Sequence, residues 1–181
     1  MFISDFYLNY FLSMSSQIER SLVVFKPDAV SRAVVGEILS RFEKRGLNII
    51  GMKMLKPNKE FFYHHYETIG KMISRRGEKP FALTLAFMQM TPVIAVVFEG
   101  VDATKVIRQM VGTTDPQAAL PGTVRGDYSY VALEYSNDHE RGVMNLLHAS
   151  GNAEEAQQEI AHWFKPEELF SYERADQTFM Y

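Results

Sequence analysis

One histidine of the sequence stands where an imidazole can act as a nucleophile. His148 ends an apolar run that is predicted to be a strand, and a helix is predicted to start just after it. An imidazole at such a position can attack phosphorus if an acceptor holds its other nitrogen and fixes the tautomer. Glu159 is a candidate acceptor if the following helix folds back along the strand. From the residues alone, a packing or surface role is the commoner interpretation of such a histidine, and it is adopted for His64, His65, His139 and His162.

Phosphate, if it is the ligand, must be bound by side-chain cations and hydroxyls. The sequence has no P-loop, no glycine-rich kinase loop, no nucleophile elbow and no EF-hand or His-Glu-x-x-His spacing. The candidates are Lys26 after the first predicted strand, and Arg108, Thr114 and Arg125 around one long loop. Guanidinium groups suit phosphate because their fork forms paired, charge-assisted hydrogen bonds. Each of these residues, taken singly, is equally consistent with a solvated surface position.

The composition excludes several classes of protein. The chain has 181 residues and no cysteine, which excludes disulfide frameworks, thiol nucleophiles and thiolate zinc sites. It is long enough for one domain with a real core, and a reducing, cytoplasmic location is expected. The net charge of −3 argues against broad binding to nucleic acid, so no nucleic-acid partner is expected.

The first residues differ from the rest of the chain. Residues 1–18 contain an aromatic, apolar run that is too short for a membrane span and lacks the features of a signal peptide. Three interpretations of this run remain open. They are a start-site artefact with Met14 as the initiator, a small docking tail, and a membrane or partner anchor. We expect an N-terminal extension over 1–18, one domain over 19–181, and no membrane association.

From Glu19 onward, short apolar runs alternate with amphipathic stretches, which indicates a mixed α/β domain. Strands are predicted at 21–25, 47–55, 93–98 and 143–148. Helices are predicted at 34–45, 59–73, 81–88, 103–111 and 152–164, with a turn at 75–80 and a long loop at 112–126. A loop of that length in a compact domain is usually functional. The order of elements predicts a ferredoxin-like two-layer sandwich with a four-stranded antiparallel sheet.

Six stretches, in order, resemble the nucleoside diphosphate kinase family. They are ERSLVVFKPDAV (19–30), VGEI (35–38), GTTDP (112–116), PGTVRGD (121–127), NLLHAS (145–150) and WFKPEEL (163–169). The resemblance implies ping-pong transfer of the γ-phosphoryl group of a nucleoside triphosphate, typically ATP, to a nucleoside diphosphate through a phosphohistidine. It also implies Mg2+ held mainly by the nucleotide phosphates, with no side-chain ligands, and a homo-oligomer that is a hexamer or a tetramer.

The resemblance assigns a role to each matched position. It implies that His148 is the phosphorylated residue and that Glu159 orients its other nitrogen. The remaining implied roles are contacts to the transferred phosphoryl group and ribose (Lys26), the 3′-hydroxyl (Asn145), the phosphates (Arg108, Thr114, Arg125), the reacting phosphate (Tyr66) and the base (Phe81, with Leu85 beside it), and a hydroxyl next to the nucleophile (Ser150).

The sequence departs from the family pattern near the nucleophile and in two inserts. Gly151 stands where the family usually has aspartate, and Asn152 is expected to cap the next helix instead. The inserts are 70–78 and 132–143, and the second is expected to form a loop or hairpin near the mouth of the site.

Two other functions are weighed. An inactive family member could serve as a nucleotide-binding regulatory module, although every matched catalytic position is kept. An RNA-binding ferredoxin-like domain is disfavoured because the RNP-type pattern is absent and the chain is acidic.

Overall fold

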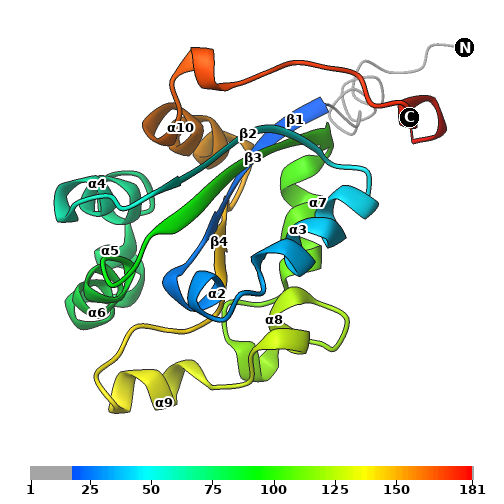
Figure 1. The fold of residues 1–181 in the computed structure, drawn as a ribbon. Helices are drawn as coiled ribbons and strands as arrows, with labels where there is room; N and C mark the ends of the chain where they lie inside the picture. Colours follow the sequence, from blue (N-terminus) through cyan, green and yellow to red (C-terminus); the bar gives the residue numbers. More distant parts are fainter. Residues whose placement is uncertain (1–17, 181) are drawn as a thin grey trace, which may run out of the picture.

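A four-stranded antiparallel sheet forms the centre of the computed structural model, which describes residues 18–180 (Figure 1). Its strands are Ile18–Phe25 (β1), Asn48–Leu55 (β2), Val93–Val101 (β3) and Leu147–Ala149 (β4), in the order β2-β3-β1-β4. Helices lie between β1 and β2, between β2 and β3, and between β3 and β4. This arrangement confirms the predicted ferredoxin-like fold. The predictions about residues 1–17 lie outside the described part of the chain.

Helices account for most of the remaining described chain. They are Pro27–Ser31 (α2), Val35–Lys44 (α3), Lys59–Tyr63 (α4), the π-helix His64–Ile69 (η1), Met72–Arg76 (α5), Glu78–Met88 (α6), Ala103–Val111 (α7), Val124–Tyr128 (α8), Leu133–Asp138 (α9) and Ala153–Trp163 (α10), with 3-10 turns at Pro116–Ala118 (η2), Pro166–Glu168 (η3) and Gln177–Phe179 (η4). None of the described helices is long and apolar enough to cross a membrane.

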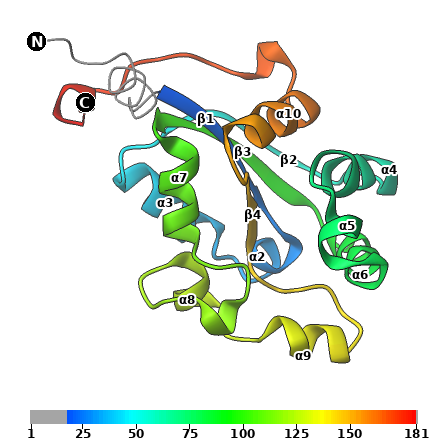
Figure 2. The same cartoon turned by 180° about the vertical axis from the view of Figure 1, so that it is seen from behind.

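Both faces of the sheet are apolar, and helices cover both. Along β1, Leu22 and Val24 face one side, where they join a core with Trp163 of α10, while Val23 and Phe25 face the other. The first face packs against α10, α4 and α6, and the second packs against α3 and α7 (Figures 1 and 2). A second helical layer is therefore added to the predicted two-layer sandwich. Burial on both faces explains why β1 reads as a continuous apolar run.

Several predicted boundaries are corrected. β4 has three residues, not the six predicted at 143–148, because Leu146 has a φ of +72° and is not extended. The turn predicted at 75–80 is the end of α5 and the start of α6, and the helix predicted at 59–73 is divided among α4, η1 and α5. The loop predicted at 112–126 contains η2 and the start of α8.

The pairing of β1 with β4 brings Lys26 and His148 together. Val24 of β1 lies opposite His148 of β4 in the antiparallel register. Residues directly opposite each other share a face, so His148 points to the side on which α10 packs. Lys26 follows β1 directly, and its amide donates to the carbonyl of Leu146 at 2.8 Å. The C-terminal end of β1 and the short strand β4 thus place Lys26 and His148 close to each other.

Candidate active site

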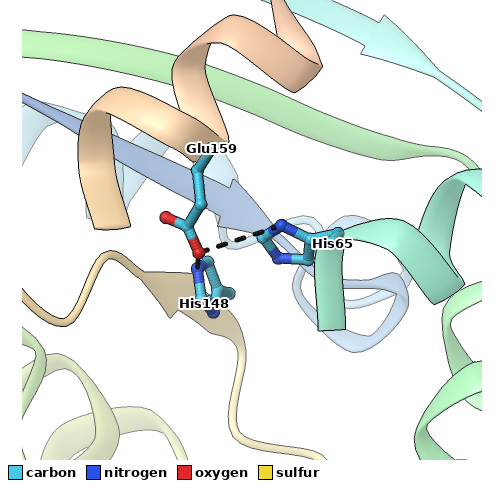
Figure 3. Close-up of side chains that lie close together, drawn as sticks. All are labelled: His65, His148 and Glu159. Atoms are coloured by element: carbon cyan, nitrogen blue, oxygen red, sulfur yellow. Dashed lines mark hydrogen bonds and ion pairs between the residues drawn. The ribbon is translucent and has the colours of Figure 1, made fainter. Parts of the chain in front are cut away.

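The His148 ring is held by a buried carboxylate. Its Nε2 lies 2.7 Å from Oε1 of Glu159, on α10 (Figure 3). Because a carboxylate only accepts, Nε2 carries the proton and Nδ1 keeps its lone pair. The other carboxylate oxygen accepts a hydrogen bond from the Ser150 hydroxyl at 2.5 Å, and that hydroxyl accepts from the Leu22 amide at 3.1 Å. The side chain that fixes the ring is therefore itself fixed to β1.

Glu159 remains ionised despite its burial. The side chain is 1% exposed, and burial alone would raise the pKa of its carboxyl group. The charge of His148 and the hydrogen bonds from His148 and Ser150 outweigh burial and bring the pKa to about 2. Glu159 is thus a permanent acceptor at neutral pH, which keeps His148 in one tautomer.

The start of α10 compensates for the aspartate that is absent at Gly151. The Asn152 side chain accepts from the Glu155 amide at 2.8 Å, so the predicted cap is confirmed. In return, the Glu155 carboxylate accepts from the Gly151 amide at 2.9 Å. A carboxylate therefore still lies at the positive end of the helix, supplied from within its first turn.

The backbone just before β4 is strained and is held by the turn after β1. Leu146 is buried with a φ of +72°, a conformation that branched side chains rarely adopt. The Leu146 amide donates to the Asp28 carboxylate at 2.9 Å, while its carbonyl accepts from the Lys26 amide. Asp28 therefore positions the segment from Asn145 to His148. The resemblance contained this residue within a matched stretch but assigned it no role.

Lys26 and Asn145 form a buried polar pair next to His148. The Lys26 ammonium donates to Oδ1 of Asn145 at 2.7 Å, and Nδ2 of Asn145 donates to the Thr114 carbonyl at 2.8 Å. Burial, with the nearby charge of Arg125 as the second cause, lowers the pKa of Lys26 to about 7. The structure therefore brings these sequence-predicted residues together and leaves the lysine ready to gain an anionic partner.

Arg125 is bound mainly to the backbone of the site. Its guanidinium donates to the carbonyls of Gly112 and Thr113, both at 3.0 Å, of Asn145 at 3.1 Å and of Leu147 at 2.8 Å. Four of its five N–H groups are therefore engaged. Arg125 ties the loop after α7 to β4 and keeps one N–H, together with its charge, for a ligand.

A cavity of about 410 Å³, a volume in the range of small-molecule sites, lies next to His148 and Glu159. Lys26, Arg76, Arg108 and Arg125 all contribute to its wall, as does His148. The carboxylates of the wall are Glu155 and Glu159, and both accept hydrogen bonds from protein groups. The cavity thus offers several cations and one imidazole lone pair, which suits a phosphorylated ligand.

Two sequence-predicted residues are not on this wall. Phe81 and Leu85 are 7% and 4% exposed and belong to the core beneath the sheet. The wall takes Pro80, Leu83 and Thr84 from the same helix. α6 is apolar on nearly every side, so its sequence did not indicate which face would turn inward. The base contacts implied for Phe81 and Leu85 stay predictions, and the residues of α6 that line the cavity are Pro80, Leu83 and Thr84.

Tyr66 lies beside His148, and its implied contact with the reacting phosphate stays a prediction. Its ring centroid is 6.1 Å from that of His148, and its buried hydroxyl has no hydrogen-bond partner among the described residues. Burial, aided by the charges of Glu159 and Asp28, raises the pKa of this hydroxyl, which stays protonated. It is available as a donor to a ligand in the cavity.

Both inserts contribute to the wall, and the sequence did not assign their residues. Arg76 comes from the first insert and makes no hydrogen bond to another described side chain. Asn137 and Arg141 come from the second, which lies at the site as predicted but contains the helix α9 rather than a hairpin. The signal available in the sequence was the pair of arginines just before Gly77.

The ligand-type atoms of His65, His148 and Glu159 lie within 4.8 Å of one another. This spacing alone could suggest a metal site. However, Nδ1 of His65 accepts from the Trp163 indole at 3.1 Å, and both Glu159 oxygens accept from neighbours. The atoms that would bind a metal already have hydrogen-bond partners. The cluster therefore fits a histidine held in one orientation better than it fits a metal centre.

Comparison with known proteins gives consistent matches over most of the chain. The family model described as nucleoside diphosphate kinase matches residues 19–169. The nucleoside diphosphate kinase of Pyrococcus horikoshii is 47% identical over 165 residues, which cover 91% of this chain and 96% of the relative.

Solved structures agree with the sequence comparison. A transition-state mimic of the Borrelia burgdorferi nucleoside diphosphate kinase with bound vanadate and ADP superposes with a TM-score of 0.87, at 36% identity and over 90% of this chain and 96% of that one. The Halobacterium salinarum enzyme in complex with CDP gives a TM-score of 0.77 at 35% identity, over 91% and 99%.

Proposed function

The chain belongs to the nucleoside diphosphate kinase family, and we propose that it transfers phosphoryl groups between nucleotides through a phosphohistidine at His148. The observation that carries this assignment is the pair formed by His148 and the ionised Glu159 in a cavity lined by cations. The pair leaves Nδ1 as the nucleophilic nitrogen. The charges and hydrogen-bond donors around the phosphates come from five residues of the cavity wall, which are Lys26, Tyr66, Arg108, Thr114 and Arg125.

In the first half-reaction, Nδ1 of His148 attacks the γ-phosphorus of a nucleoside triphosphate. The N–P bond forms as the bond from phosphorus to the β–γ bridging oxygen breaks, and the nucleoside diphosphate leaves with that electron pair. In the second, a terminal oxygen of another nucleoside diphosphate attacks the same phosphorus, and the electron pair of the N–P bond returns to Nδ1. Nε2 keeps its proton throughout, because the Glu159 carboxylate accepts the hydrogen bond from Nε2–H in every state. The protein mainly supplies alignment and charge, as this chemistry requires.

Magnesium is expected to be held by the nucleotide phosphates and water. The residues fit this arrangement because the wall carboxylates, Glu155 and Glu159, already accept hydrogen bonds from protein groups. When bound, the cation would neutralise charge on the phosphates. Lys26 and the arginines of the wall would then share the remaining charge.

The test is phosphoryl transfer from ATP to GDP by the purified chain. Ping-pong kinetics, with parallel lines in double-reciprocal plots, are expected. An inactive family member that only binds nucleotides would bind ATP without forming GTP, and that result would contradict the proposal. A hexameric or tetrameric assembly and a cytoplasmic location remain predictions, and light scattering and cell fractionation test them.

Arg76 is expected to add affinity for the phosphates. It is an exposed residue of the cavity wall, and its charge acts on both Lys26 and Arg125. Replacing Arg76 with methionine should raise KM for ATP roughly fivefold to tenfold with little change in kcat, as expected for a partly exposed cation worth about 1 kcal/mol. Arg45→Met, at the exposed end of α3, is the matched control. An unchanged KM in the Arg76 variant would exclude it from the phosphate site.

Nucleotide binding is expected to take up a proton above neutral pH. Lys26 has a pKa of about 7 in the free protein, so it is mostly neutral at pH 8. A bound phosphate favours the charged form and raises this pKa, so ADP binding at pH 8 should draw up to about one proton from the buffer. At pH 6 the lysine is already charged and uptake should nearly vanish. Calorimetry in buffers of different ionisation enthalpy measures the number of protons, and equal uptake by Lys26→Met would contradict the assignment.

A further inference from the structure

His65 is a buried imidazole without a role in the proposed reaction. Its side chain is 1% exposed and lines the same cavity as His148. The two rings meet edge to face, with their centroids 4.5 Å apart. His65 belongs to the π-helix η1. This form of helix is rare in proteins, and where it occurs it is often at a functional site. This turn buries His65 and Tyr66, which are consecutive in the chain, on the side of the nucleophile.

The hydrogen bond from Trp163 fixes the tautomer of His65. The indole Nε1 donates to Nδ1 of His65 at 3.1 Å, and an indole N–H can only donate. Nδ1 therefore carries a lone pair, and the proton of the neutral ring is on Nε2. Glu159 Oε1 lies 3.8 Å from Nδ1, beyond hydrogen-bond distance. Burial, followed by the charge of His148, lowers the pKa of His65 well below its ordinary value, so the ring stays neutral.

The Nε2–H group of His65 is a buried donor without an acceptor among the described residues. Such groups are costly unless a ligand or water completes them. Figure 3 shows the imidazoles of His65 and His148 next to each other beside the Glu159 carboxylate, with one nitrogen of each joined to it by a dashed line. The unpaired N–H of His65 and the free lone pair of His148 therefore belong to neighbouring rings on the wall of one cavity.

We propose that Nε2–H of His65 donates a hydrogen bond to a non-bridging oxygen of the phosphoryl group during its transfer to and from His148. This inference rests on the proposed function of His148. No proton is transferred, because the neutral ring donates and keeps its proton. A neutral donor stabilises the oxygen without trapping the phosphoryl group as a cation would. Lys26 and Tyr66 line the same cavity, so the proposed donor acts beside the Lys26 ammonium and the Tyr66 hydroxyl.

Three variants separate donation from packing against His148. His65→Phe keeps a flat ring without the donor, and its single-turnover phosphorylation by ATP should be roughly tenfold to hundredfold slower, as for the loss of one hydrogen bond to a charged group. His65→Gln keeps an N–H near Nε2 and should return to within about threefold of the wild type. Trp163→Phe releases Nδ1 and should slow the same step, since the proton is no longer confined to Nε2. Nucleotide affinity and the thermal unfolding midpoint are measured alongside for each variant.

Long-range 1H–15N spectra of the wild-type protein give an independent readout. The His65 ring should show the Nε2–H tautomer without titrating near neutral pH, and its N–H resonance should move downfield when His148 is phosphorylated. A folded His65→Phe variant that is phosphorylated at the wild-type rate, a His65→Gln variant as slow as His65→Phe, or an Nδ1–H tautomer would each overturn the proposal. Absence of any phosphoenzyme in the wild type would instead refute the proposed function of His148, and this inference with it.

Discussion

His148→Ala is expected to reduce phosphoryl transfer from ATP to GDP by at least roughly four orders of magnitude. The reason is that the nucleophile is lost and no other imidazole can replace it in the same geometry. His65 is the nearest ring, but Trp163 occupies its lone pair, and the free nitrogen of His65 carries a proton. The variant should also fail to incorporate phosphate from labelled ATP.

The fold should tolerate this substitution. The His148 side chain is only partly buried, and Glu159 retains its bond from Ser150. Nucleotide binding measured by calorimetry should therefore survive, which separates lost chemistry from lost structure. His64→Ala is the matched control, because His64 is exposed on the π-helix, and it should keep wild-type activity. Labelled protein in the His148 variant would place the nucleophile elsewhere.

Lys26→Met is expected to lower kcat roughly a hundredfold to a thousandfold, the usual effect of removing one preorganised donor from a buried site. Methionine keeps most of the length of the side chain but removes its charge beside His148. Because Lys26 is 8% exposed, little water is present to replace the ammonium in stabilising the transferring phosphoryl group. The substitution also removes the donor to Asn145 Oδ1, which is itself buried.

The split between the kinetic constants identifies what Lys26 does. A group that acts mainly on the transferring phosphoryl lowers kcat, whereas one that only binds nucleotide raises KM. Steady-state rates at saturating ATP therefore provide the measurement. Lys105→Met, on the exposed side of α7, is the control and should behave like the wild type. A Lys26→Met enzyme with normal kcat would exclude the lysine from the reaction itself.

Local patterns in the sequence were sufficient for the elements that frame the site. The bounds predicted for α7 agree with the structure, and the Asn152 cap was legible from its spacing to Glu155. The order of strands and helices predicted the ferredoxin-like sheet, since few topologies fit that order. The residues alone did not determine whether His148 pairs with Glu159. It depends on α10 folding back along β1, which periodicity does not determine.

Other parts of the site needed the three-dimensional packing. The π-helix has no period that a sequence scan detects, so the burial of His65 beside the nucleophile was not predicted. α6 is apolar all round, and the choice between Phe81 and Pro80 as a wall residue depended on which face met the sheet. Arg76 reaches the cavity only because the first insert forms the helix α5.

The central claim is that Nδ1 of His148 carries the phosphoryl group, and 31P NMR of the phosphoenzyme tests it most directly. The protein is phosphorylated with ATP and magnesium, freed of nucleotide and examined at alkaline pH, where phosphohistidines persist. Because Glu159 holds Nε2, the spectrum should show one phosphohistidine substituted at Nδ1, and the signal should be absent from His148→Ala. A phosphoryl group on Nε2, on another residue, or nowhere would contradict this account.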